Sequence, residues 1–305
     1  MNKITYNKQY IDNSDIKILS IAAKQKLITT GNFVKKFEKS FEKYLKVKNS
    51  ISCINGTAGL DLAFKAIELN TNDVIVMPVV NFVASYSMAN NLGAKIVLSD
   101  VDPITGQMTP QTLIDCIKKN RLKKIKAVVT MYLGGFAENI EKFHFLKRKY
   151  KFLLIEDACH ALGSKYQIGN KIYRIGSCKH SDICVFSFHP VKSITTGEGG
   201  MVTTNNKIFA KKIKLIKNHN MIKSKNYWEY DIKKCSINYR LSDINCALGI
   251  SQLKKLSKFI KKRNIIASHY DKNFKNLENF ITPNKNKNVY NAYHLYPLKI
   301  NFKTF

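Results

Sequence analysis

The feature that most constrains the fold is an alternation of two patterns between about residues 30 and 215. One pattern has helical period, as in Phe33–Leu45, where apolar residues recur every three or four positions. The other is a short β-branched apolar run that ends in polar or turn residues. It occurs at Asp73–Pro78, Ala94–Asp100, Ala127–Tyr132 and Phe152–Asp157. Because parallel strands need crossover helices and are buried on both faces, this order predicts an α/β domain with a mostly parallel sheet.

The polar residues at the ends of these runs are the first candidates for a functional site. In open α/β sheets, ligands bind beyond the carboxyl ends of the strands. The residues at those positions are Asp100, Tyr132, Glu156 and Asp157. We therefore expect the chemistry of the chain to gather around them.

Beyond residue 215 the sequence becomes richer in lysine, which suggests a second structural unit. A long helix is expected from about Ser242 to Arg263, and His294–Ile300 has the character of a strand. We expect an N-terminal segment (1–25) that packs on the substrate site, a large domain (26–215) and a smaller α+β domain (216–305). Because no strand follows His294–Ile300 to pair with it, the smaller domain is expected to be incomplete.

Composition excludes several classes of protein. With 305 residues, 45% of them hydrophobic, the chain can bury a large core. It has no apolar stretch long enough to span a membrane and no signal-peptide core at Met1–Tyr6, so we expect a cytoplasmic protein with no membrane partner. The seven cysteines lack C-x-x-C spacing, which argues against structural zinc and a disulfide framework, and we expect no metal.

The formal net charge of +30 raises the question of nucleic-acid binding. The lysines are spread along the whole chain beside many asparagines and isoleucines, and no basic motif interleaved with aromatic residues occurs. We therefore expect no nucleic-acid partner. A positive field would nevertheless attract a nucleotide diphosphate substrate.

Lys192 stands in the densest motif of the sequence, Val185–Thr204. An apolar run ends at Ser187, and a turn rich in glycine (residues 197–200) leads into another apolar run. A lysine that forms a Schiff base needs a desolvated setting, because only the neutral amine is nucleophilic. The position of Lys192 suits that role, although a solvated surface lysine is the alternative for any single lysine in this chain.

Two acidic residues, Glu156 and Asp157, follow the apolar run Phe152–Ile155. Asp157 is followed by Ala-Cys-His-Ala-Leu-Gly. Pyridoxal chemistry needs a carboxylate near the ring nitrogen, because a protonated nitrogen makes the ring an electron sink. Asp157 suits this role, but Glu156 could also take it, and an aspartate at a strand end is also a common helix N-cap. His160 would stack on such a ring or fill a packed turn.

Two further segments suit a cofactor. Ser52–Phe64 has the order strand, glycine turn and helix, which points backbone N–H groups at an anion such as a phosphate. The same order is common without a ligand. Phe82 follows another strand, where an aromatic ring lies against a flat cofactor or joins the core, and its residue type alone favours the core.

Taken together and in this order, these segments resemble the DegT-type sugar aminotransferases, which are pyridoxal phosphate enzymes with the aspartate aminotransferase fold. The resemblance runs from Tyr6 to Pro297. Its main motifs are Asn55–Leu60, Glu156–Gly163, Phe186–Lys192 and Asn238–Asp243. The runs His160–Ser164 and Ala247–Lys255 are similar to the branch of the family that serves pseudaminic acid synthesis.

The resemblance implies a role for each matching residue. Lys192 would be the Schiff-base lysine and Asp157 the partner of the pyridine nitrogen, with Phe82 and His160 flanking the ring. The residues that would hold the phosphate are Gly56, Thr57, Ala58 and Ser187. Asn238 would reach the cofactor of a second subunit, which implies a homodimer with shared active sites. The residues that would contact the nucleotide sugar are Tyr6, Lys26, Leu27, Ile28, Thr29 and Asn238.

The reaction implied by the resemblance is transamination from glutamate, through pyridoxal 5′-phosphate, to the C4 ketone of a UDP-linked 4-keto-6-deoxy sugar. Lys192 would move the proton in both halves. Related dehydratases carry histidine in place of this lysine, so Lys192 favours transamination. The alternatives are an aminotransferase for another UDP-, dTDP- or GDP-linked keto sugar, a dehydratase, and a non-enzymatic binding protein. Relatives continue beyond Pro297, so we expect either a truncated form or a compact variant.

Overall fold

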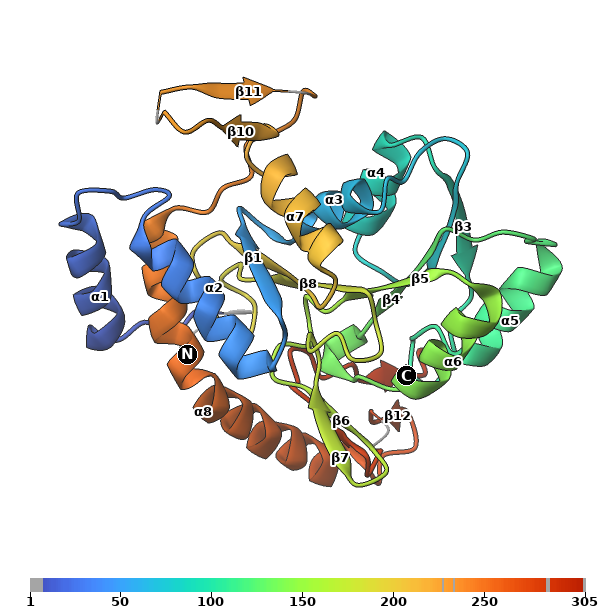
Figure 1. Ribbon diagram of the computed structural model, residues 1–305. Coiled ribbons are helices and arrows are strands. Elements are labelled where there is room, and N and C mark those ends of the chain that lie inside the picture. The colour runs from blue at the N-terminus through green and yellow to red at the C-terminus, as the bar shows by residue number, and fades with distance from the viewer. Residues whose placement is uncertain (1–7, 227, 233, 284–285, 304–305) are drawn as a thin grey trace.

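A central sheet with helices on both faces forms the body of the molecule (Figure 1). The computed structural model describes residues 8–226, 228–232, 234–283 and 286–303. Within them the sheet has seven strands in the order β1-β9-β8-β5-β4-β2-β3. Their bounds are β1 (Asn49–Cys53), β2 (Val74–Pro78), β3 (Lys95–Ser99), β4 (Ala127–Met131), β5 (Leu153–Asp157), β8 (Ile183–Ser187) and β9 (Gly200–Thr204).

The sheet is mostly parallel, as predicted. Strands β3, β2, β4, β5 and β8 pair in parallel from one edge inward. Only β9 runs against them, since it pairs antiparallel with both β8 and β1. The connection between β8 and β9, residues 188–199, contains no helix, and the two strands pair antiparallel.

Each face of the sheet is covered by its own helices. One face packs against α3 (Gly56–Ala66), α4 (Ala84–Asn91) and α7 (Lys207–Ile216), and the other against α2 (Asn32–Leu45), α5 (Pro110–Lys119), α6 (Ile140–Tyr150) and α8 (Asp243–Phe274). In β2, Ile75 and Met77 join the first layer while Val76 joins the second. Both sides of the inner strands β2, β4, β5 and β8 are buried, so these strands appear in the sequence as largely apolar runs, whereas the edge strand β3 is partly exposed.

Helix α2 packs on α8 through an aromatic stripe. Phe33, Phe37 and Phe41 recur at every fourth position and are buried. Gly249 of α8 permits the close approach, because a Cβ there would stand 2.5 Å from the Phe37 ring. Helix α8 starts as predicted but ends at Phe274 instead of near Arg263. No glycine or proline lies between Arg263 and Phe274, and buried Ala267 continues the inner face of the helix.

Asp243, the first residue of α8, also caps α2. The N-cap of α2 is Gly31, which has no side chain for the purpose. The buried Asp243 carboxylate accepts the N–H groups of Gly31 at 2.6 Å, Phe33 at 2.7 Å and Val34 at 3.3 Å. A residue 212 positions away in sequence therefore accepts the unpaired N–H groups at the start of α2 and fixes the loop that precedes this helix.

Shorter elements complete the structure. Helix α1 (Asn13–Ala23) lies on α8, and a 3-10 turn, η1 (Leu133–Gly135), follows β4. The remaining strands are β6 (Lys165–Ile168) with β7 (Lys171–Arg174) and β13 (Val289–Tyr290), β10 (Met221–Lys223) with β11 (Tyr230–Ile232), and β12 (Phe280–Ile281) with β14 (Lys299–Ile300). The strand expected at His294–Ile300 is thus only two residues long, and it pairs with β12, which precedes it. Within the described parts of the chain, no helix combines the length and apolar character that crossing a membrane requires.

Candidate active site

The segments that follow the parallel strands enclose a cavity of about 660 Å³ at the carboxyl edge of the sheet. Lys192 and Asp157, which the sequence places on different segments, both line it. The other lining residues are Asn55, Gly56, Thr57, Leu60, Val80, Asn81, Phe82, Ala84, Met131, Leu133, Cys159, His160, Ser187, His189, Val191 and Glu198. A ligand in this cavity would therefore contact residues from five different strand ends, where α/β sheets bind ligands.

Of the two carboxylates at the end of β5, only Asp157 lines the cavity. Its Oδ1 accepts the backbone N–H of Cys159 at 3.2 Å, and its Oδ2 accepts the Ser85 hydroxyl at 3.4 Å. Glu156 faces the other side of the strand, where its Oε1 accepts the Tyr132 hydroxyl at 2.7 Å. Burial raises the pKa of both carboxyl groups. Of the positions left open by the sequence, Asp157 is thus the one that a ligand can meet.

Lys192 lies in the loop between β8 and β9, which is closed at its base by hydrogen bonds. The Phe188 N–H donates to Gly199 O at 2.7 Å, and Phe188 O accepts the Thr196 N–H at 3.0 Å. Burial lowers the pKa of Lys192, an effect that the nearby Cys159 and Asp157 oppose. The half-buried lysine therefore has a larger neutral fraction than a solvated one.

The first turn of α3 meets the cavity through Gly56 and Thr57. First-turn N–H groups have no acceptor inside their own helix. The side chain of the N-cap residue Asn55 accepts a hydrogen bond from the Ala58 N–H at 2.8 Å. Ala58 is buried and does not line the cavity. A Cβ on Gly56 would stand 2.9 Å from Ser187 Cβ, so the α3 turn and the end of β8 form one tight cradle.

Phe82 and His160 line the cavity in different ways. Phe82 is 68% exposed, so the expectation from residue type that it joins the core is wrong. The His160 ring lies 4.3 Å from that of His294, at an interplanar angle of 49°. The Nδ1 atoms of both rings are buried without a hydrogen-bond partner among the described residues. Chiefly through burial, the pKa of His160 is lowered to about 3 and that of His294 to about 2, so both rings are neutral near pH 7.

The other predicted residues that the structure describes lie outside the lining of this cavity. Tyr6 is not among the described residues. The segment Lys26–Thr29 forms an exposed loop, in which Ile28 O accepts the Asp243 N–H. Asn238 forms an isolated bridge with Asn218, and its Oδ1 accepts the Arg240 N–H at 3.2 Å. The cavity of a single chain thus contains the predicted cofactor residues except Ala58 and Asn238, and none of the predicted substrate residues that are described.

Sequence reasoning missed several residues at this site. Asn81 donates to Ser85 Oγ at 3.3 Å, and its Oδ1 is buried without a partner among the described residues. Cys159 lines the cavity, and burial raises the pKa of its thiol. The position of Asn81 and Ser85 just after β2 was a signal, because the strand ends mark the site. His294 had no such signal, since it reaches His160 from the far end of the chain.

The sequence matches a known family along almost its whole length. The model of the DegT/DnrJ/EryC1/StrS aminotransferase family matches residues 9–305. One curated relative is the UDP-4-amino-4,6-dideoxy-N-acetyl-beta-L-altrosamine transaminase of Campylobacter jejuni subsp. jejuni serotype O:23/36 (strain 81-176). It is 39% identical over 97% of this chain and 76% of its own length.

Solved structures show the same similarity in three dimensions. Helicobacter pylori PseC, an aminotransferase involved in the biosynthesis of pseudoaminic acid, has a TM-score of 0.91 and 30% identity, covering 99% of this chain and 79% of its own. Spr1654 from Streptococcus pneumoniae in its PLP-form has a TM-score of 0.88 and 25% identity, covering 98% of this chain and 78% of its own.

Proposed function

Because this chain belongs to the DegT/DnrJ/EryC1/StrS aminotransferase family and is a sugar aminotransferase, we propose that it transfers the amino group of glutamate to the C4 ketone of a UDP-linked 4-keto-6-deoxy sugar. The observation that carries the proposal is the convergence of Lys192, Asp157 and the start of α3 on one cavity. The choice of sugar is supported by the names of the Campylobacter and Helicobacter relatives. We infer that the product serves pseudaminic acid synthesis.

We propose that the cavity holds pyridoxal 5′-phosphate, because it offers a partner for each part of that molecule. Its phosphate would meet the N–H groups of Gly56 and Thr57 at the positive end of α3, and the Ser187 hydroxyl. The buried Asp157 carboxylate has no cationic partner among its hydrogen bonds, and a protonated pyridine nitrogen would supply one. The unpartnered Asn81 Oδ1 adds an acceptor beside it.

Lys192 would carry the proton in both halves of the reaction. When bound, pyridoxal phosphate supplies the electron sink that makes the substrate C–H bond acidic. The lowered pKa of Lys192 leaves more of the neutral amine that accepts a proton. The two halves move the proton in opposite directions, and one amine on a flexible side chain can serve both.

The neighbours of Lys192 keep competing proton transfers out of the site. His160, with its pKa lowered to about 3, stays neutral near pH 7. Burial also raises the pKa of the Cys159 thiol, so this group stays protonated. Met131 and Leu133 line the cavity with apolar surface that keeps water from the reacting atoms.

We further propose a homodimer with shared active sites. The β10–β11 hairpin stands away from the body of the molecule (Figure 1) and carries the exposed side chains of Trp228 (65%), Tyr230 (58%) and Ile232 (45%). Asn238 follows this hairpin and lies outside the cavity of its own chain. Exchange of hairpins across a two-fold axis would cover the apolar side chains and bring Asn238 to the other cavity. On this proposal, the smaller domain begins near residue 216, where α7 ends.

Chemical trapping tests the cofactor and the lysine together. The full chain, reconstituted with pyridoxal phosphate, should turn yellow, and borohydride should fix the cofactor on Lys192, as peptide mass mapping would show. The variant Lys192→Ala should bind the cofactor without being labelled at that position. Labelling of another lysine, or none in the wild type, would refute the assignment.

Product analysis tests the sugar and the reaction class. The holoenzyme should aminate a UDP-linked 4-keto-6-deoxy sugar in preference to dTDP- and GDP-linked ones, with mass spectrometry of the product as the readout. Conversion should require glutamate. Loss of a hydroxyl group without amination would identify a dehydratase instead, and a preference for another nucleotide would reassign the substrate.

A further inference from the structure

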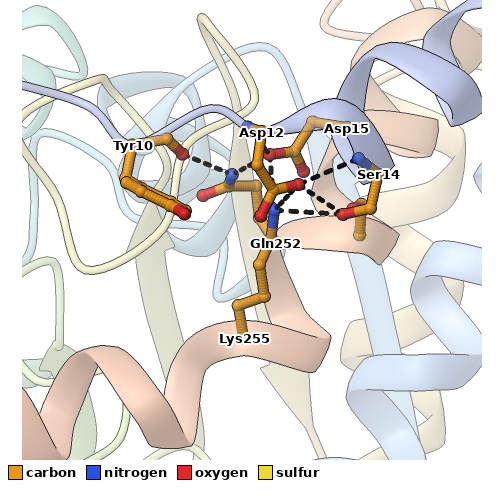
Figure 2. Close-up of polar contacts among 7 residues, drawn as sticks. Tyr10, Asp12, Ser14, Asp15, Gln252 and Lys255 are labelled. Atoms are coloured by element: carbon orange, nitrogen blue, oxygen red, sulfur yellow. Dashed lines mark hydrogen bonds and ion pairs between the residues drawn. The ribbon is translucent and has the colours of Figure 1, made fainter.

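A buried ion pair fixes the N-terminal segment to α8 (Figure 2). Asp15 is 0% exposed, and its Oδ2 accepts Lys255 Nζ at 2.5 Å and Gln252 Nε2 at 3.0 Å. Lys255 Nζ also lies 2.9 Å from Asp12 Oδ1. Burial acts to lower the pKa of Lys255, but the two carboxylates outweigh it and raise that pKa, so the lysine stays charged. We call Asp12, Asp15, Gln252 and Lys255 the N-terminal clamp.

The N-terminal clamp continues into the segment that precedes α1. Gln252 Nε2 donates to Tyr10 O at 2.9 Å as well as to Asp15. The Tyr10 ring meets Phe259 of α8 edge-on, with centroids 5.7 Å apart, and Lys255 Nζ lies 5.7 Å from the Tyr10 centroid. A buried charge requires its partners in one arrangement, so the backbone at Tyr10 is held at a fixed place on α8.

This placement builds one wall of a second cavity, of about 280 Å³, that reaches Lys192. Residues 8–10 form one side of it, the loop 190–195 forms another, and α8 contributes Gln252, Phe259, Lys262, Arg263 and Ile266. Lys192 lines both this cavity and the larger one described above. Lys192 is thus the residue that the two cavities share.

The charge of the second cavity selects an anion. Lys8, Lys262 and Arg263 supply positive charge to its lining, and its described lining residues include no acidic side chain. The N-terminal clamp has two carboxylates and the single positive charge of Lys255, but neither carboxylate lines the cavity. A diphosphate would neutralise the cationic walls, whereas an uncharged ligand would leave them unpaired.

We propose that the N-terminal clamp is a positioning device, which holds residues 8–10 as the wall of a subsite for the diphosphate of the nucleotide sugar. The inference rests on the proposed function, because that function supplies the nucleotide. Asp15 and Lys255 act through the segment they hold, while Lys262 faces the ligand.

The test measures uridine diphosphate binding to the holoenzyme by titration calorimetry. Lys255→Met removes the charge-assisted contacts to Asp12 and Asp15 and should weaken binding roughly tenfold, because the residues that they order form one wall of the subsite. Lys262→Met should weaken it comparably, and Lys255→Arg should restore most of the affinity. The matched control is Lys147→Met, which breaks the Lys147–Asp182 pair of 2.7 Å at similar exposure, 21% for Lys147 against 16% for Lys255. This variant should bind like the wild type.

Kinetics separate the clamp from the proposed function. Lys255→Met should raise KM for the nucleotide sugar while leaving the cofactor band and the glutamate half-reaction unchanged. If Lys255→Met does not fold, Asp15→Asn, which keeps the side-chain shape, should likewise raise KM for the nucleotide sugar and leave the cofactor band and the glutamate half-reaction unchanged. Unchanged uridine diphosphate affinity in these variants, equal weakening in Lys147→Met, or no binding by the wild type would overturn the inference. Failure of the Lys192 label with the binding series intact would overturn the proposed function alone.

Discussion

Replacement of Asp243 with alanine should cost more stability than the loss of an ordinary helix cap. The Asp243 carboxylate accepts three backbone N–H groups at the start of α2, and it is completely buried. Alanine would leave Gly31, Phe33 and Val34 without their acceptor in a place closed to solvent. It would also remove a negative charge from the positive end of two helices, α2 and α8.

The size of the effect follows from the number of donors left unpaired. Each buried donor without a partner costs roughly 1–3 kcal/mol, so three donors near the lower limit give about 3 kcal/mol. The exposed cap Asn206, which accepts the N–H groups of Ile208 and Phe209 at the start of α7, provides the comparison. Asn206→Ala should cost about 1 kcal/mol, as is usual for an exposed cap.

Urea denaturation of the holoenzyme, followed by circular dichroism, measures the difference. The midpoint should fall in Asp243→Ala by about three times the shift in Asn206→Ala, at an unchanged slope. Asp243→Asn, which keeps one acceptor oxygen, should lie between them. A loss in Asp243→Ala no greater than that in Asn206→Ala would refute the reasoning, because the buried donors would then have found other partners.

Three further predictions concern the site and its surroundings. Burial raises the pKa of Glu156 above its ordinary 4.5, so between the two values the folded state binds more protons and stability falls as pH rises. Glu156→Gln, which still accepts the Tyr132 hydroxyl, should lessen the loss of unfolding free energy between about pH 5 and about pH 8, as measured by denaturation curves at the two pH values. An equal loss in the variant and the wild type would contradict this prediction. Gly56→Ala should weaken pyridoxal phosphate binding roughly tenfold in a fluorescence titration, since its Cβ would stand 2.9 Å from Ser187 Cβ; unchanged affinity would show that the cradle can widen. Phe82→Ala should change stability by no more than about 0.5 kcal/mol because the ring is 68% exposed, while cofactor dissociation should accelerate; a large fall in thermal midpoint would mean that the ring supports the fold.

Much of the sheet could be predicted because its strands are buried on both faces. The runs ending at Pro78 and Asp157 have no polar interruption, and this pattern distinguishes them from the amphipathic α2. The end of α8 could not be predicted, because what continues the helix past Arg263 is its contact with distant segments. One such contact is the hydrogen bond from Arg263 to Tyr293 O at 3.1 Å.

The sequence predicted which strand ends form the site, but it did not predict which residues at those ends face the cavity. Adjacent residues of a strand face opposite sides, so the strand pattern alone could not choose between Glu156 and Asp157, and only the family resemblance favoured Asp157. In the structure Tyr132 closes the side that Glu156 faces. The sequence also could not anticipate that Asn55 uses the N–H of Ala58, which leaves Gly56 and Thr57 to face the cavity. Such choices depend on three-dimensional pairings and not on residue type.

The packing of α2 on α8 also bears on how the chain is synthesised. The aromatic stripe Phe33–Phe41 emerges from the ribosome early, but Asp243 and the helix that covers the stripe follow about 200 residues later. At roughly 5–20 residues per second, that interval lasts on the order of 10–40 s. During this time the stripe has neither its cover nor its cap, so a nascent chain would present it to chaperones before the sheet can close.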